Sequence, residues 1–152
     1  MIRFDFTLRG AGWGGAVVAN ERAKVSVSAS YLTDAFRDFA DAVQRLFTEE
    51  DTECVWEIEP GEFRWKFRRV GPDCAVEVFQ NDRVQAIFSG SDDLLHFSSQ
   101  VDISLRKLLD DFGEERYLRE WDHSFPREVH AKLRRTIEDE RKVRALNSEG
   151  SK

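Results

Sequence analysis

Residues 54–67 read CVWEIEPGEFRWKF, and this stretch decides the fold of the chain. Apolar and charged residues alternate on both sides of Pro60-Gly61, a pair that favours a turn because proline presets φ and glycine accepts a positive φ. The alternation predicts a β-hairpin with one apolar face and one charged face, closed by a four-residue loop. A turn centred on Pro60-Gly61 pairs Ile58 with Phe63, Trp56 with Trp65 and Cys54 with Phe67 on the apolar face, and Glu57 with Arg64 and Glu53 with Arg68 on the charged face.

The composition predicts one domain with a substantial core. The chain has 152 residues, of which 41% are hydrophobic and 12% aromatic. Its net charge of -6 disfavours binding to nucleic acid or to an anionic membrane, and mildly favours a basic protein partner. No apolar run approaches the roughly 18 residues of a membrane span, and the first residues do not resemble a signal peptide. We therefore expect a cytoplasmic protein.

The two cysteines, Cys54 and Cys74, occupy apolar positions of predicted strands. Two cysteines are too few for a disulfide framework. We expect buried reduced thiols, and a disulfide between neighbouring strands is the alternative.

The remaining strands and helices follow from the spacing of apolar residues. A period of two indicates strands, and apolar residues three and four positions apart indicate amphipathic helices. The predicted fold is α+β, a mostly antiparallel sheet of six or seven strands with helices packed on one face, the face that carries Trp56 and Trp65. We expect a single domain over residues 1–146 and a disordered tail over 147–152. The expected strands are 2–8, 16–19, 23–30, the two arms of the central hairpin, 74–80 and 83–89, and the expected helices are 33–47, 101–112 ending at Gly113, 114–121 and one that starts at Pro126.

A glycine-rich segment, Gly10 to Gly15, matches the spacing G-x-G-x-x-G after a strand. That motif binds a dinucleotide when a helix begins on the loop and presents its free N–H groups to the pyrophosphate. Here a valine-rich strand resumes too soon for such a helix, so we interpret the segment as a hairpin loop without a cofactor. Trp13 in this loop is a candidate contact residue, because an exposed tryptophan often marks a binding surface.

The three histidines, His96, His123 and His130, do not form a metal-binding pattern, and no cofactor is predicted. Asp92 and His96 would lie one turn apart on a helix, which is compatible with a ligand pair but is typical of a surface ion pair. No nucleophile motif such as G-x-S-x-G occurs, so no catalytic residue is assigned and we lean against an enzyme.

The segment Trp121-Asp122-His123-Ser124-Phe125-Pro126 combines an aromatic ring, an acid, an imidazole and a hydroxyl. The structural interpretation places Ser124 as a helix cap, Phe125 as a hydrophobic staple and Trp121 over the joint between two helices. The functional interpretation makes Trp121 and His123 contacts for a small molecule or a partner.

Segments 31–42 (YLTDAFRDFADA) and 56–65 (WEIEPGEFRW), followed by Tyr117, Trp121 and Phe125-Pro126, resemble a group of small uncharacterised bacterial proteins in which such segments occur in the same order. The resemblance spans most of the chain and implies an α+β fold, but it supplies no catalytic residue. The size, acidity and layout are also similar to those of the immunity proteins of bacterial toxin systems, which implies a protein partner.

Three functional hypotheses follow. The first is a non-enzymatic module, immunity-like in character, that binds another protein through its acidic surface. The second is a small-ligand or enzymatic pocket between sheet and helices that uses Trp121, His123 and His96. The third is a homo-oligomer assembled through an edge strand or the charged C-terminal helix.

Overall fold

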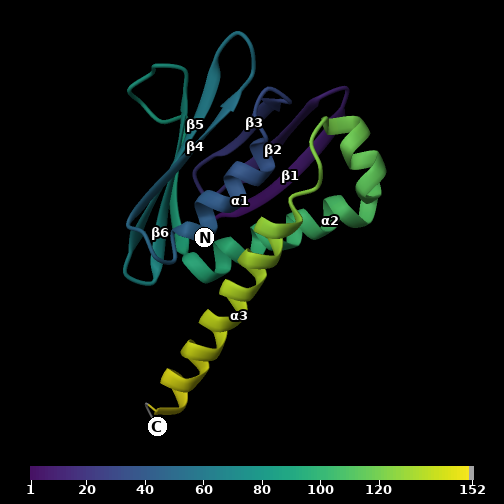
Figure 1. Cartoon of the computed structure of the whole chain (residues 1–152). Coiled ribbons are helices and arrows are strands. Elements are labelled where there is room, and N and C mark those ends of the chain that lie inside the picture. Colours follow the sequence, from purple (N-terminus) through teal and green to yellow (C-terminus); the bar gives the residue numbers. More distant parts are fainter. Residues whose placement is uncertain (151–152) are drawn as a thin grey trace.

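The computed structural model describes residues 1–150, which form an α+β fold as predicted (Figure 1). The strands form two antiparallel sheets, β1-β2-β3 and β4-β5-β6-β7, and so the prediction of one sheet with six or seven strands is wrong. In chain order the elements are β1 (Arg3–Gly10), β2 (Trp13–Ala19), β3 (Lys24–Ser30), α1 (Ala35–Arg45), β4 (Asp51–Glu57), β5 (Glu62–Val70), β6 (Asp73–Gln80), β7 (Phe88–Asp93), α2 (Leu94–Trp121) and α3 (Arg127–Gly150).

The two sheets separate at the connection that contains α1. The strands β3 and β4 do not pair as a ladder, and their ends are joined through side chains: Ser30 Oγ donates to Glu57 O at 2.8 Å. Thr33 Oγ1 accepts a 3.4 Å hydrogen bond from Glu57 N. Ser30 and Thr33, two residues that favour a helix cap by type, therefore fix the end of β4.

Both sheets bury their inner faces on α1. Phe39 of this helix lies 4.7 Å from the Phe4 ring of β1 and 4.8 Å from the Trp65 ring of β5. Trp56 and Trp65 are fully buried with ring centroids 5.1 Å apart, and Trp56 Nε1 donates to Ala35 O at 3.1 Å. The prediction that helices cover the tryptophan face is confirmed for α1. A single aromatic core thus joins the two sheets.

The central hairpin has the predicted faces but a different register. Its loop places Ile58 N 3.0 Å from Gly61 O, and the ladder begins at the pair Glu57 and Glu62. The turn is therefore centred one residue earlier than predicted, which shifts every partner by two residues and leaves each side chain on its face. The observed pairs are Trp56 with Phe63, Cys54 with Trp65 and Thr52 with Phe67, and the ion pairs of the charged face join Glu53 to Arg64 at 2.9 Å and Asp51 to Arg68 at 3.2 Å.

Two boundaries after β6 also differ from the prediction. The last strand is Phe88–Asp93 rather than 83–89, and Val84 in the preceding loop is 93% exposed. The following helix, α2, begins at Leu94, seven residues before the predicted start, because Asp93 Oδ1 accepts the His96 N–H at 3.1 Å and caps it. Gly113 (φ 70°, ψ 166°) kinks α2 at the position where we predicted one helix to end and another to begin.

The C-terminal helix α3 buries Leu133 and Ile137 against the body, and its distal half extends away from the sheets (Figure 1). The chain is helical through Gly150, where we predicted a disordered tail from residue 147. Residues 151–152 of that predicted tail lie outside the described part. None of the helices within residues 1–150 combines the length and the apolar character that a membrane crossing requires.

Cys54 and Cys74 are buried free thiols, as predicted. Burial raises the pKa of both, that of Cys74 to about 12. Neither thiol ionises near neutral pH, so both act as small apolar core residues.

Candidate functional site

The β1–β2 turn brings Trp13 to the surface at one end of the molecule. Ala11 (φ 55°) and Gly12 (φ 79°) form a two-residue turn with positive φ at both positions, which suits a tight hairpin. The chain continues directly into β2, so the segment is part of a hairpin as predicted, but the loop is shorter than expected: only Ala11 and Gly12 form it, Gly10 belongs to β1, and Trp13 to Gly15 belong to β2. Trp13, the first residue of β2, is 40% exposed.

Trp13 belongs to a cluster of exposed apolar residues that we call the aromatic patch, comprising Trp13, Tyr31 and Leu32. Tyr31 and Leu32 follow β3 and are 46% and 45% exposed. Tyr31 N donates to Gly12 O at 2.8 Å, and a Cβ atom built on Gly12 would lie 2.7 Å from Tyr31 Cδ1. The absence of a side chain at Gly12 therefore allows the Tyr31 ring to lie against the turn, beside Trp13.

The C-terminal end of α2 is hydrogen-bonded to the backbone beside the patch residues. Gly12 N donates to Glu120 O at 2.8 Å, and His123 Nε2 donates to Tyr31 O at 2.6 Å. The Trp121 ring lies 5.6 Å from that of His123 and stacks on Phe36 of α1 at 4.7 Å. Three of the four predicted site residues, Trp13, Trp121 and His123, are thus brought together. Trp121 is fully buried, and so it supports the patch from inside.

Three buried polar atoms in this region, Asp34 Oδ1, Tyr117 Oη and Trp121 Nε1, make no hydrogen bond within the usual distance and angle limits in residues 1–150. The Trp121 N–H nevertheless lies near the Asp34 carboxylate and lowers its pKa, so Tyr117 Oη is the atom without a nearby donor or acceptor among the three. Such atoms are rare in folded proteins because leaving one unpaired costs free energy. Burial, together with the negative charge of Asp34, raises the pKa of Tyr117 far above its usual value. The hydroxyl therefore stays neutral, and the cluster has spare hydrogen-bonding capacity.

Two carboxylates at the start of α1, Asp34 at its N-cap and Asp38 in its first turn, lie near His123. Burial raises the pKa of Asp34 although the nearby His123 ring, whose Nδ1 lies 3.9 Å from Asp34 Oδ2, opposes the shift. Burial and the neighbouring Asp34 likewise raise the pKa of Asp38. Both groups would be stabilised in the ionised form by an added positive charge.

His96, the fourth predicted residue, lies at the opposite end of α2 from Trp121. Its Nδ1 is 2.6 Å from Asp92 Oδ2, and the same carboxylate oxygen accepts the Ile2 N–H at 3.1 Å. The structure does not bring His96 to the other three residues. The Asp92–His96 pair instead fixes the start of β1.

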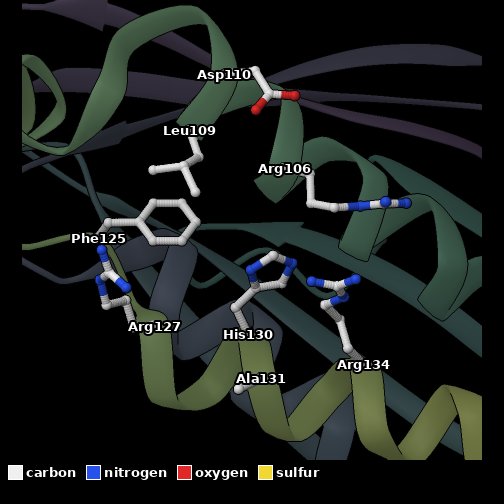
Figure 2. Close-up of a pocket in the computed structure, with 8 residues that line it drawn as sticks. All are labelled: Arg106, Leu109, Asp110, Phe125, Arg127, His130, Ala131 and Arg134. Carbon is white, nitrogen blue, oxygen red and sulfur yellow. The ribbon is translucent and has the colours of Figure 1, made fainter.

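Apart from the aromatic patch, a hollow of about 380 Å³ lies between α2 and α3 (Figure 2). The sequence reasoning missed it, although a signal was present: positions 127, 130, 131 and 134 share one helical face. No periodicity reveals that this face meets α2. The lining residues are Arg106, Leu109, Asp110, Phe125, Arg127, His130, Ala131 and Arg134.

Comparison with known proteins finds no match to the chain among family models, curated proteins or solved structures. Within residues 1–150 no three His, Cys, Asp or Glu side chains gather in a way that could hold a metal ion. The geometry of the chain itself is therefore the basis for the proposals that follow.

Proposed function

We propose that the chain is a protein-binding module whose aromatic patch is the centre of the interface. The observation that carries this proposal is the exposure of Trp13, Tyr31 and Leu32, each 40–46% accessible, at the adjoining ends of β2 and β3, where Trp13 pairs with Ser30 and Tyr31 N donates to Gly12 O. Tryptophan and tyrosine dominate the binding energy of protein interfaces because a partner can bury their large rings at low entropic cost.

The rim of the patch indicates a basic partner. Asp34 lies 3.9 Å from the His123 ring that bonds Tyr31, and the backbone of Glu57 is bonded to Ser30 and Thr33 on either side of Tyr31 and Leu32. Asp38 follows one turn after Asp34 and pairs with Arg37 at 3.5 Å. A lysine or arginine of the partner would relieve the unfavourable ionisation of the two aspartates. The net charge of -6 would also accelerate the encounter with a basic protein. Neutralising a basic toxin, as immunity proteins do, is one role of this kind.

A small-ligand or enzymatic site at Trp121 and His123 is supported less well. Trp121 has no exposed surface, and a ligand that contacts it would have to open the stack on Phe36. Asp34 lines a surface hollow together with Arg37 and residues 124–129, but the buried Tyr117 and Trp121 are not among the lining residues of that hollow.

The proposal is tested by capture of a partner on the immobilised chain from an extract of its native host, followed by reconstitution with the purified partner. We expect stoichiometric retention of one basic protein by the unaltered chain. Trp13→Ala and Tyr31→Ala should each weaken the Kd by about 30-fold or more, because interface hot spots contribute 2 kcal/mol or more. Raising the salt concentration should slow association, since the rim attraction is screened.

Val84→Ala is the matched control, because Val84 is 93% exposed but lies in the β6–β7 loop, and it should bind normally. Leu32→Ser is a second patch variant with less risk to the fold, and thermal unfolding verifies each protein. Retention of the same partner with equal affinity by all three patch variants would refute the proposal.

A further inference from the structure

The hollow between α2 and α3 has a cationic end and an apolar end. Arg106 from α2 and Arg134 from α3 lie beside the His130 ring at one side of the hollow, whereas Leu109 and Phe125 lie at the other (Figure 2). Ala131 of α3 also lines the hollow, and its small, exposed side chain fills little of the space. Its volume of about 380 Å³ falls at the lower end of the range for small-molecule sites.

One buried carboxylate organises the cationic end. Asp102 Oδ1 lies 2.7 Å from His130 Nε2, and both side chains are about nine-tenths buried. The guanidinium of Arg106 approaches Asp102 Oδ2 at 3.4 Å, and that of Arg134 approaches Oδ1 at 3.9 Å. Asp102 thus positions three nitrogen-bearing side chains from two helices around a single point.

The two arginines carry more charge and more donors than Asp102 can satisfy. Within residues 1–150 neither guanidinium makes a hydrogen bond that meets the usual distance and angle limits to a protein acceptor, although each has five N–H donors. Asp102 faces both guanidiniums, and the other carboxylate of the lining, Asp110, lies one turn after Arg106 on α2 and forms no ion pair with either arginine within residues 1–150. Arg127 differs because it is paired with Glu114, and Asp110 lies at the rim away from Arg134 (Figure 2).

We propose that this hollow binds a small organic carboxylate with a short apolar tail. The carboxylate accepts hydrogen bonds from Arg106 and Arg134, whose planar forks suit that geometry, and the tail lies on Leu109 and Phe125. His130 and Asp102 are positioning residues for the two arginines. The site shares no residue with the aromatic patch and does not depend on the proposed protein-binding function.

The test is a titration of the whole chain with acetate, butanoate and hexanoate, followed by amide chemical shifts and calorimetry. We expect shifts centred on 106–109 and 130–134, and an affinity that rises about threefold per added methylene as the tail becomes buried. Butan-1-ol and hexan-1-ol, which lack the charge, should bind at least tenfold more weakly. Inorganic phosphate, which lacks the tail, should bind more weakly than hexanoate.

Arg106→Gln and Arg134→Gln should each lower hexanoate affinity about tenfold or more, because each removes a charge-assisted hydrogen bond. Arg135→Gln is the matched control, since Arg135 is exposed, next in sequence and not part of the lining, and it should bind normally. Arg134→Lys keeps the charge with less risk to the fold and should bind with intermediate affinity. The proposal fails if hexanoate does not bind, if alcohols or phosphate bind as tightly, or if Arg135→Gln weakens binding as much as the lining variants.

Discussion

The two ends of α2 handle their buried polar groups in opposite ways. At and just before its N-terminal end, the polar side chains are all hydrogen-bonded: Asp92, Asp93, His96 and Gln100. Two of them bond the start of β1. Asp92 accepts the Ile2 N–H, and Gln100 accepts the Phe4 N–H at 2.9 Å and donates to Ile2 O at 2.6 Å. At its C-terminal end the buried Tyr117 hydroxyl has no hydrogen-bond partner within residues 1–150, and the Trp121 N–H makes only a poorly aligned contact with the Asp34 carboxylate.

This difference predicts opposite effects of substitution at the two ends. Satisfied polar groups at the first end stabilise the fold, so changing them should cost stability. At the second end an unpaired buried hydroxyl lowers stability, so removing it should raise stability. The four predictions below test that contrast.

Asp92→Ala should have the largest effect, a loss of about 3 kcal/mol in the free energy of unfolding. The variant leaves the buried Ile2 N–H unpaired and removes the acceptor for His96 Nδ1. Urea unfolding of the variant measures the loss. Asp82→Ala, in an exposed turn, is the control and should change stability little. An equal effect of the two variants would contradict a structural role for this end.

Gln100→Ala should cost about 2 kcal/mol, because it removes one acceptor and one donor for the β1 backbone. Besides lowering the free energy of unfolding, the variant should loosen β1 locally. Amide hydrogen exchange at Phe4 should accelerate more than exchange in the β4–β5 hairpin. Gln85→Ala, at an exposed loop position, is the matched control. Unchanged protection at Phe4 would show that the Gln100 bonds do not hold the strand.

Tyr117→Phe should have the opposite sign and raise stability by up to about 1 kcal/mol. The variant removes a buried hydroxyl that has no protein partner and keeps the ring that packs 5.4 Å from Phe125. Tyr31→Phe, where the residue is 46% exposed, should have no effect. A loss of stability in Tyr117→Phe would mean that the hydroxyl is satisfied, and the contrast between the two ends would weaken.

Asp34→Asn should give the smallest effect, visible as a change in pH dependence. Burial raises the pKa of Asp34 in the folded state, so the ionised carboxylate lowers stability at neutral pH. This penalty disappears as the pH falls through the folded pKa and below the unfolded value of about 3.9. The variant should therefore be more stable than the unaltered chain at pH 7, with the difference shrinking towards pH 4 in urea titrations. A difference that grows in acid would contradict the raised pKa.

The sequence predicts elements whose signals are local. The alternation around Trp56 and Trp65 fixes the buried face of the hairpin whatever the register, since a shift of two residues changes no face. Gly113 marks the helix kink because its positive φ favours glycine. The tight turn before Trp13 contains Gly10 and Gly12, which accept the positive φ that the turn requires, whereas Ala11 between them adopts a φ of 55° that its type does not favour.

Features that depend on which elements meet could not be predicted. Alternating strands do not reveal that α1 separates β3 from β4 and yields two sheets. The joining of Trp13 to Trp121 and His123 depends on a bond between Gly12 and Glu120, which no periodicity encodes. The hollow between α2 and α3 could not be predicted for the same reason. Arg106 and Arg134 belong to separate helices, and in the sequence each resembles an ordinary solvated charge.

The hydrogen bonds that join Asp92 of β7 and Gln100 of α2 to the backbone at the start of β1 also constrain how copies of the chain could associate. A strand from a second molecule that added alongside Ile2 and Phe4 would compete with Asp92 and Gln100 for the same backbone groups. The first part of this border is therefore closed to intermolecular ladder formation, the usual route to aggregation through an open sheet. The other edge strands of the two sheets are β3, β4 and β7.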